Sequence, residues 1–205
     1  MDWISATPIY DSQGLWIGGQ SIVENWEEPI QEVLAKSVFY SLEDKILEIG
    51  YGLGFASQTV AKHNPLYHTV IEAHPSIAKK AKTELPATTL IIEAFWQEAI
   101  KQFEDNIFDG LIFDAYTLSD VHFDGTLESN FNYAKPILHA AKRILRIGGK
   151  LSFLDFSCQI DTIKEFQEIV TTNYSKYEII KVEIKIPESC TYASGTYANV
   201  IVITK

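Results

Sequence analysis

Basic residues are scarce in this chain of 205 residues. Seventeen lysines and arginines stand against 27 aspartates and glutamates, which gives a formal net charge of −10. A negative charge repels nucleic-acid phosphates and anionic lipid head groups, so we expect neither nucleic acid nor a membrane as partner. The excess of carboxylates suits a cationic small molecule, although acidity also serves solubility alone.

Cysteine is equally rare. Cys158 and Cys190 are the only two, and they form neither a zinc pattern nor a disulfide framework. The five histidines include no H-x-x-x-H or H-E-x-x-H grouping, so we expect no metal. The first residues lack the character of a signal peptide, and no apolar run approaches the roughly 18 residues that cross a bilayer. We expect a soluble, cytoplasmic protein.

Internal repeats, linkers and low-complexity stretches are also missing, which predicts a single domain over residues 1–205. Within it, apolar β-branched runs alternate with helical patterns, and this alternation predicts a parallel sheet with helices on both faces. The predicted strands are Lys45–Gly50, Tyr67–Ala73, Thr88–Glu93, Phe108–Asp114 and Lys150–Phe156. The predicted helices between them are Phe55–His63, Pro75–Thr83, Phe95–Phe103 and Pro136–Arg146, the last opening on a proline and stopping at Gly148-Gly149.

The C-terminal part breaks this rhythm. Tyr177–Ile186 and Tyr197–Thr204 are two strand patterns with only a turn region between them, which predicts an antiparallel hairpin. A mostly parallel, seven-stranded α/β sheet that ends in such a hairpin resembles the Rossmann-like fold of class I methyltransferases. A further predicted helix, Trp26–Lys36, precedes the first strand, and we expect residues 1–40 to cover the active site.

The sharpest local signal is a glycine-rich loop directly after the first strand, Glu48-Ile49-Gly50-Tyr51-Gly52-Leu53-Gly54. Glycines let the backbone turn tightly and approach a ligand closely, and the following helix offers free N–H groups. The spacing is G-x-G-x-G rather than the G-x-G-x-x-G of dinucleotide sites, and no G-x-x-x-x-G-K-[ST] run is present. The loop therefore favours a nucleoside other than a nicotinamide dinucleotide.

Two further segments fit a nucleoside site. Glu72 ends the second strand, where a carboxylate can accept hydrogen bonds from both ribose hydroxyls. Alone, it would more readily be a solvated carboxylate at a strand end, but together with the glycine loop it favours the ribose role. Phe95 and Trp96 follow the third strand, where their rings can face adenine or simply fill the core.

Several separated motifs together resemble the guanidinoacetate N-methyltransferase family, from about Leu15 to Lys205. They are Glu24-Asn25-Trp26-Glu27-Glu28-Pro29, the glycine loop, Phe95-Trp96-Gln97-Glu98, Phe113-Asp114-Ala115-Tyr116 and Cys190-Thr191-Tyr192. The run Ile71-Glu72-Ala73-His74-Pro75 is also similar to the protein arginine δ-N-methyltransferases, which usually carry a large extra N-terminal region.

The resemblance implies S-adenosyl-L-methionine as cofactor and two catalytic carboxylates, Glu27 and Asp114, which hold the guanidinium of the acceptor beside the sulfonium methyl. We expect Asp114 to accept the proton while Glu27 fixes the second nitrogen. Cofactor contacts are implied at Val23, Glu27, Gln31, Gly50, Tyr51, Gly52, Leu53, Gly54, Phe55, Glu72, Ala73, His74, Phe95, Trp96 and Asp114. Acceptor contacts are implied at Glu27, Asp114, Tyr116, Asp155, Phe156 and Ser157.

One position departs from the family pattern. Asp155 stands where an asparagine is expected near the carboxylate of the acceptor, and two carboxylates that close repel each other. Either the acceptor lacks a carboxylate, or Asp155 turns away and pairs with a lysine or a backbone N–H. Three functions therefore stay open: an N-methyltransferase for a small guanidino or amino compound, guanidinoacetate included; a protein arginine methyltransferase; and a non-catalytic nucleoside-binding protein of the same fold.

Overall fold

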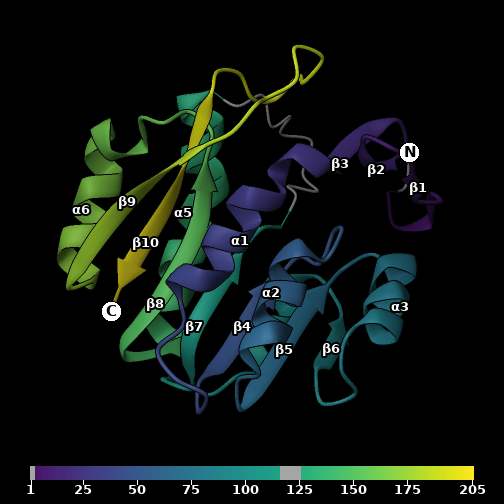
Figure 1. Ribbon diagram of the computed structural model, residues 1–205. Helices are drawn as coiled ribbons and strands as arrows, with labels where there is room; N and C mark the ends of the chain where they lie inside the picture. Colours follow the sequence, from purple (N-terminus) through teal and green to yellow (C-terminus); the bar gives the residue numbers. More distant parts are fainter. Residues whose placement is uncertain (1–2, 116–125) are drawn as a thin grey trace.

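The computed structural model describes residues 3–115 and 126–205. Its main sheet has seven strands in the order β6-β5-β4-β7-β8-β10-β9 (Figure 1). The strands are β4 (Lys45–Ile49), β5 (Tyr67–Glu72), β6 (Leu90–Glu93), β7 (Phe108–Phe113), β8 (Leu145–Asp155), β9 (Lys176–Glu183) and β10 (Tyr197–Thr204). The first five are parallel, and β10 is antiparallel to both of its neighbours. The predicted fold class is thereby confirmed.

Helices cover both faces of this sheet because its central strands are apolar on both sides. On β4, for example, Ile46 packs in the cluster that holds α1 and α2, while Leu47 packs in the cluster of α5 and α6. The helices are α1 (Glu28–Ser37), α2 (Phe55–His63), α3 (Pro75–Glu84), α4 (Trp96–Ala99), α5 (Leu127–Ile144) and α6 (Lys164–Asn173). Short 3-10 turns are η1 (Trp3–Ser5), η2 (Asn25–Glu27), η3 (Ile100–Gln102) and η4 (Ile160–Thr162).

A second, three-stranded antiparallel sheet precedes α1. It consists of β1 (Ile9–Tyr10), β2 (Gly14–Ile17) and β3 (Gln20–Glu24), and it lies above α3 in the view of Figure 1. Leu15 and Val23 pack in one buried cluster with Val70 of β5 and Ile77 of α3. This packing fixes the end of β3, and with it η2, beside the main sheet.

Helix α5 differs most from the prediction. It begins at Leu127 rather than at Pro136, with the Thr126 hydroxyl as N-cap accepting from the Ser129 N–H at 3.3 Å. Pro136 lies inside the helix, and Gly148-Gly149 lie within β8 instead of ending the helix. An internal proline removes one backbone hydrogen bond and so destabilises a helix. In α5 this loss is outweighed by the N-cap and by the burial of side chains three or four residues apart.

Two structural absences concern residues 3–115 and 126–205. None of their helices combines the length and apolarity needed to cross a membrane. No three His, Cys, Asp or Glu side chains within these ranges gather so that they could hold a metal ion.

Candidate active site

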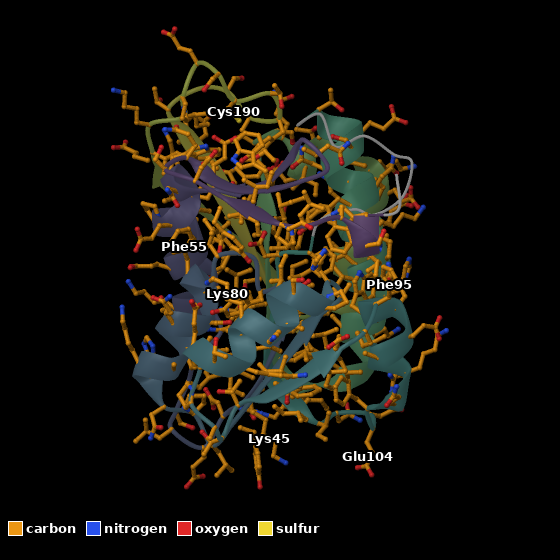
Figure 2. All side chains as sticks on the ribbon, turned by 90° about the vertical axis from the view of Figure 1, so that its right-hand side faces the viewer. Lys45, Phe55, Lys80, Phe95, Glu104 and Cys190 are labelled. Carbon is orange, nitrogen blue, oxygen red and sulfur yellow. The ribbon has the colours of Figure 1, made fainter. Side chains whose placement is uncertain are left out.

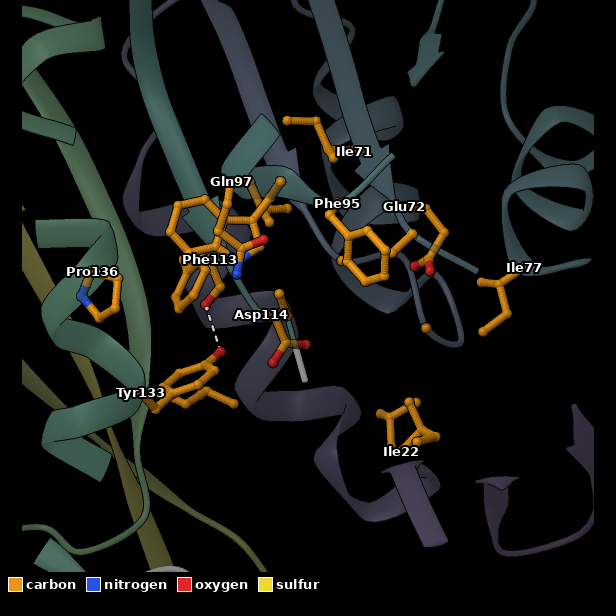
Figure 3. A pocket seen from close by; sticks show the side chains of 18 of the residues that line it. Ile22, Ile71, Glu72, Ile77, Phe95, Gln97, Phe113, Asp114, Tyr133 and Pro136 are labelled. Carbon is orange, nitrogen blue, oxygen red and sulfur yellow. Dashed lines mark hydrogen bonds between the residues drawn. The ribbon is translucent and has the colours of Figure 1, made fainter. Parts of the chain in front are cut away.

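A cavity of about 600 Å³ lies where the parallel strands end (Figure 3). Each of the five parallel strands ends at or just before one of its lining residues: Gly50, Glu72, Ala94, Asp114 and Phe156. Strand order reverses between β4 and β7, and open α/β sheets bind their ligands at such a point. The cavity therefore lies at the position that this topology favours for a ligand.

The glycine loop borders the cavity at two positions where a side chain would collide with its neighbours. Gly50 and Gly52 have φ angles of +91° and +55°, a region that favours glycine. A Cβ at Gly50 would lie 2.1 Å from the Asp114 carbonyl oxygen, and one at Gly52 would lie 3.1 Å from the Val23 Cγ1. The bare backbone thus borders the cavity at the start of α2.

Glu72 is held rigidly at the end of β5. One of its carboxylate oxygens accepts from the Tyr51 N–H at 2.9 Å and the other from the His74 N–H at 2.8 Å. Burial raises the pKa of this carboxyl, and the backbone hydrogen bonds oppose the rise. A carboxylate has about four lone-pair sites, so Glu72 can accept a further hydrogen bond from a hydroxyl.

The two aromatic residues after β6 have different surroundings. The side chain of Phe95 is 43% exposed and lies near Glu72 in Figure 3. The Trp96 ring packs edge-on against Phe113 with 5.5 Å between ring centroids, and it also lines the cavity. Phe95 is thus free to contact a ligand, whereas Trp96 is shared between the core and the cavity.

Glu27 reaches the cavity from η2. Its Oε1 accepts from the backbone N–H of Glu24 at 2.7 Å and from the Tyr192 hydroxyl at 2.6 Å. The side chain is buried, and burial, reinforced by the charge of Asp114, raises its pKa to about 8 although both hydrogen bonds oppose the rise. Glu27 therefore takes up a proton close to neutral pH.

Asp114 follows β7 and lies in Figure 3 between the Glu72 end and the Tyr133 end of the cavity. Burial, followed by the charge of Glu48, raises its pKa to about 7. Within the described part of the chain its carboxylate accepts no hydrogen bond. Among the described residues of the lining, neither carboxylate has a positively charged partner. Two such carboxylates in one cavity, with pKa values near neutrality, make a strong site for a cation.

Two tyrosines complete this end of the cavity, and the sequence did not mark either as a site residue. Tyr133 of α5 donates to the Phe113 carbonyl at 3.4 Å, drawn as a dashed line in Figure 3. Tyr192, on the loop between β9 and β10, stacks on Trp26 with 6.0 Å between ring centroids. The family motif Cys190-Thr191-Tyr192 could have identified Tyr192 from the sequence. Nothing in the sequence pointed to Tyr133, because the helix that carries it was predicted to begin only at Pro136.

The structure brings together ten of the expected site residues and leaves eight outside the lining. The cavity is lined by Val23, Glu27, Gly50, Gly52, Glu72, Ala73, Phe95, Trp96, Asp114 and Phe156. Outside the lining are Gln31, Tyr51, Leu53, Gly54, Phe55, His74, Asp155 and Ser157. Tyr51 and His74 act on the site through the N–H groups that hold Glu72. Tyr116 lies outside the described residues.

The structure decides between the two orientations that the sequence left open for Asp155. The resemblance implied an acceptor contact there, but the side chain is fully buried and does not belong to the described lining of the cavity. Its oxygens accept from the Ser157 N–H at 3.0 Å and from the Ile160 N–H at 3.1 Å, and the Ser157 hydroxyl donates to it as well. The backbone turn after β8 supplies these donors, so the second alternative, a pairing with backbone N–H groups, is the one observed.

Known proteins resemble the chain in fold and sequence. The spermidine synthase of Thermotoga maritima matches with a TM-score of 0.65 and 19% identity over 93% of this chain and 65% of that one. An O-methyltransferase from Bacillus cereus, solved in complex with SAH, matches with a TM-score of 0.53 and 14% identity over 89% and 82% of the two chains. These likenesses show the fold.

Curated relatives are named protein arginine N-methyltransferase 2. The protein from Saccharomyces cerevisiae is 25% identical over 75% of this chain and 38% of its own length, and that from Debaryomyces hansenii is 25% identical over 82% and 40%. The chain thus spans less than half the length of these relatives. The family model described as guanidinoacetate N-methyltransferase matches residues 1–201. With the fold, the glycine loop and the carboxylate pair in place, the chain belongs to the guanidinoacetate N-methyltransferase family of S-adenosyl-L-methionine-dependent enzymes.

Proposed function

We propose that this protein transfers a methyl group from S-adenosyl-L-methionine to a guanidino nitrogen of a small molecule. The observation that carries the proposal is the pair Glu27 and Asp114. Both line one cavity, and both have pKa values near neutrality because burial penalises their charges, with Asp114 further raising the pKa of Glu27. A guanidinium would relieve this penalty, since its planar fork of N–H donors matches carboxylate oxygens.

The opposite end of the cavity suits the cofactor. The backbone of Gly50 and Gly52 leaves room for a close approach, and the fixed carboxylate of Glu72 can accept from ribose hydroxyls. We assign Phe95 to the adenine. Residues 1–40 belong to this proposal as a cover, since they bring Val23 and Glu27 to the lining.

The mechanism assigns one role to each carboxylate. Bound S-adenosyl-L-methionine supplies a methyl carbon that is already activated by its positive sulfur. Glu27 orients the guanidine, and its own orientation is fixed by the Glu24 N–H and the Tyr192 hydroxyl. Asp114 would take the proton from the nitrogen of the acceptor, which would leave a neutral lone pair aimed at the methyl group that the cofactor supplies. A pKa raised to about 7 by burial makes Asp114 a better base than an ordinary aspartate.

A second candidate acceptor is an arginine side chain in a protein, because the curated relatives carry the name protein arginine N-methyltransferase 2. The guanidine chemistry at Glu27 and Asp114 would be the same for both acceptors. An arginine-containing peptide therefore belongs in any acceptor screen.

The test replaces each carboxylate by its amide. Asp114→Asn keeps the shape but removes the proton acceptor, so turnover should fall by roughly 10²–10⁴ while affinity for S-adenosylhomocysteine stays within a few-fold. Glu27→Gln should mainly weaken acceptor binding. Methyl transfer from labelled cofactor and calorimetry measure the two effects.

Asp105→Asn serves as the matched control, since Asp105 lies outside the cavity in a surface ion pair with Arg143. Its turnover should equal that of the wild type. Near-wild-type methyl transfer in both Asp114→Asn and Glu27→Gln would reject the pair as the active centre.

A further inference from the structure

The described lining of the cavity carries charge of one sign. Its ionisable carboxyl groups are Glu27, Glu72, Glu98 and Asp114, and it contains no Lys, Arg or His. Residues 116–125, which the structure does not describe, include one histidine, His122, but no lysine or arginine in their sequence. A carboxylate on the acceptor would therefore find no lysine or arginine to pair with, whereas S-adenosyl-L-methionine brings an ammonium and a sulfonium with its own carboxylate.

Without a cation, an acceptor carboxylate would depend on neutral donors such as the side-chain amides of Gln97 and Asn132 in the lining. The backbone N–H groups of the turn after β8 are largely occupied. Four of the five N–H groups of residues 156–160 donate a hydrogen bond within the protein. Asp155 accepts from Ser157 and Ile160, the Asn130 Oδ1 accepts from Phe156 at 2.9 Å, and the Ser157 hydroxyl accepts from Gln159 at 3.3 Å. The buried carboxylate of Asp155 thus occupies the N–H groups with which this turn could otherwise bind an anion.

Aromatic side chains border the cavity beside Glu27. Trp26, Phe156 and Tyr192 pack together with ring centroids 5.8–6.0 Å apart, and the last two line the cavity. Tyr192 also bonds to Glu27, so this aromatic cluster adjoins the carboxylate proposed to hold the guanidine. Such a surface favours an uncharged group, because a carboxylate buried against it would lose its hydration and gain no hydrogen bond or ion pair.

We infer that the acceptor is a guanidine with an uncharged aliphatic or aromatic substituent, and that guanidino acids are poor acceptors. The inference rests on the proposed function, since it takes the Glu27–Asp114 pair as the guanidine site. The substituent lies against Phe156 and Tyr192. Small alkylguanidines and arginine side chains in peptides share this chemistry.

The experiment compares acceptors that differ only at the end of the substituent. Guanidinoacetate is paired with 2-methylpropylguanidine, in which two methyl groups replace the carboxylate oxygens, and an acetylated arginine amide represents a peptide. Affinities are measured by competition calorimetry with S-adenosylhomocysteine bound, and methyl transfer is measured separately. We expect 2-methylpropylguanidine to bind about 10- to 100-fold more tightly than guanidinoacetate.

A lysine in the aromatic cluster should change this ranking. Phe156→Lys offers a carboxylate its missing partner and should narrow the affinity gap or reverse it, while Phe156→Met, of similar length but neutral, should retain it. Thermal unfolding shows whether both variants fold like the wild type. If Phe156→Lys does not fold, the order of acceptor affinities of the wild-type protein alone tests the inference.

The outcomes separate the two proposals. Equal or tighter binding of guanidinoacetate by the wild type overturns this inference and leaves the proposed function intact. Absence of both binding and methyl transfer for every guanidine overturns the two together. Preference for the acetylated arginine amide over 2-methylpropylguanidine supports the inference and identifies peptides as the source of the substituent.

Discussion

Tyr192 is the residue whose side chain links the substrate end of the cavity to the C-terminal hairpin. Its hydroxyl donates to Glu27, a residue 165 positions earlier in the chain. The bond stabilises the charged form of Glu27 and so holds down a pKa that burial and Asp114 raise. The pKa of the Tyr192 hydroxyl is itself raised far above its ordinary value by burial and by Glu27, so it remains a donor at every relevant pH. Tyr192 is thus a positioning residue for Glu27, the carboxylate proposed to bind the acceptor.

Removal of that hydroxyl should shift a pH profile. In Tyr192→Phe the pKa of Glu27 rises further because a stabilising donor is lost, so a guanidinium binds well only at higher pH. We expect the profile of kcat/KM to move upward in pH, with KM raised several-fold at pH 7 and kcat changed less.

The matched control is Tyr67→Phe on the exposed start of β5, which should leave the profile in place. A Tyr192→Phe profile that coincides with the wild type would show that the hydrogen bond does not tune Glu27.

The glycine loop between β4 and α2 acts as one element. In Gly52→Val the added side chain meets Val23 and forces a branched residue to a φ of +55°, so cofactor affinity should fall by at least about 100-fold. Calorimetry with S-adenosylhomocysteine measures the loss.

Gly148→Val is the control, because Gly148 has a φ of +82° but open surroundings and lies outside the cavity lining. It shares the backbone strain and should keep its affinity. If Gly52→Val bound as tightly as the control, the loop would not contact the cofactor.

Elements also show where the sequence was informative. Strands β4, β5 and β7 were predicted almost to the residue, because buried parallel strands are apolar and the glycine loop marks the end of the first one. The start of α5 was missed because a proline at a first helical position and one inside a helix look alike in a single sequence. The orientation of Asp155 was equally unpredictable, since it depends on a backbone turn and not on the residue type.

At the scale of the whole molecule, the site should make stability depend on pH. The pKa values of Glu27 and Asp114 are raised to about 8 and 7 by burial, from ordinary values of 4.5 and 3.8. At a pH between the ordinary and the raised pKa values, the folded protein holds protons that the unfolded chain has released. The free energy of unfolding therefore falls as the pH rises through this range.

The ligand-free protein should therefore melt at a lower temperature at pH 8.5 than at pH 6, by on the order of 10 °C. The double variant with Glu27→Gln and Asp114→Asn should lose most of this slope because neither side chain can ionise. Calorimetric melting of both proteins across this range provides the comparison, and parallel slopes would contradict the assignment of the protons to this pair.

The span of 165 residues between Glu27 and Tyr192 also governs the order of events during folding. Contacts of such separation close a long loop of chain and form late, after local helices and neighbouring strands have paired. A chain emerging from the ribosome can complete its glycine loop well before it has made Tyr192. If the cofactor and the acceptor bind as proposed, cofactor binding can precede acceptor recognition during synthesis, because Tyr192 reaches Glu27 only when the last hairpin docks.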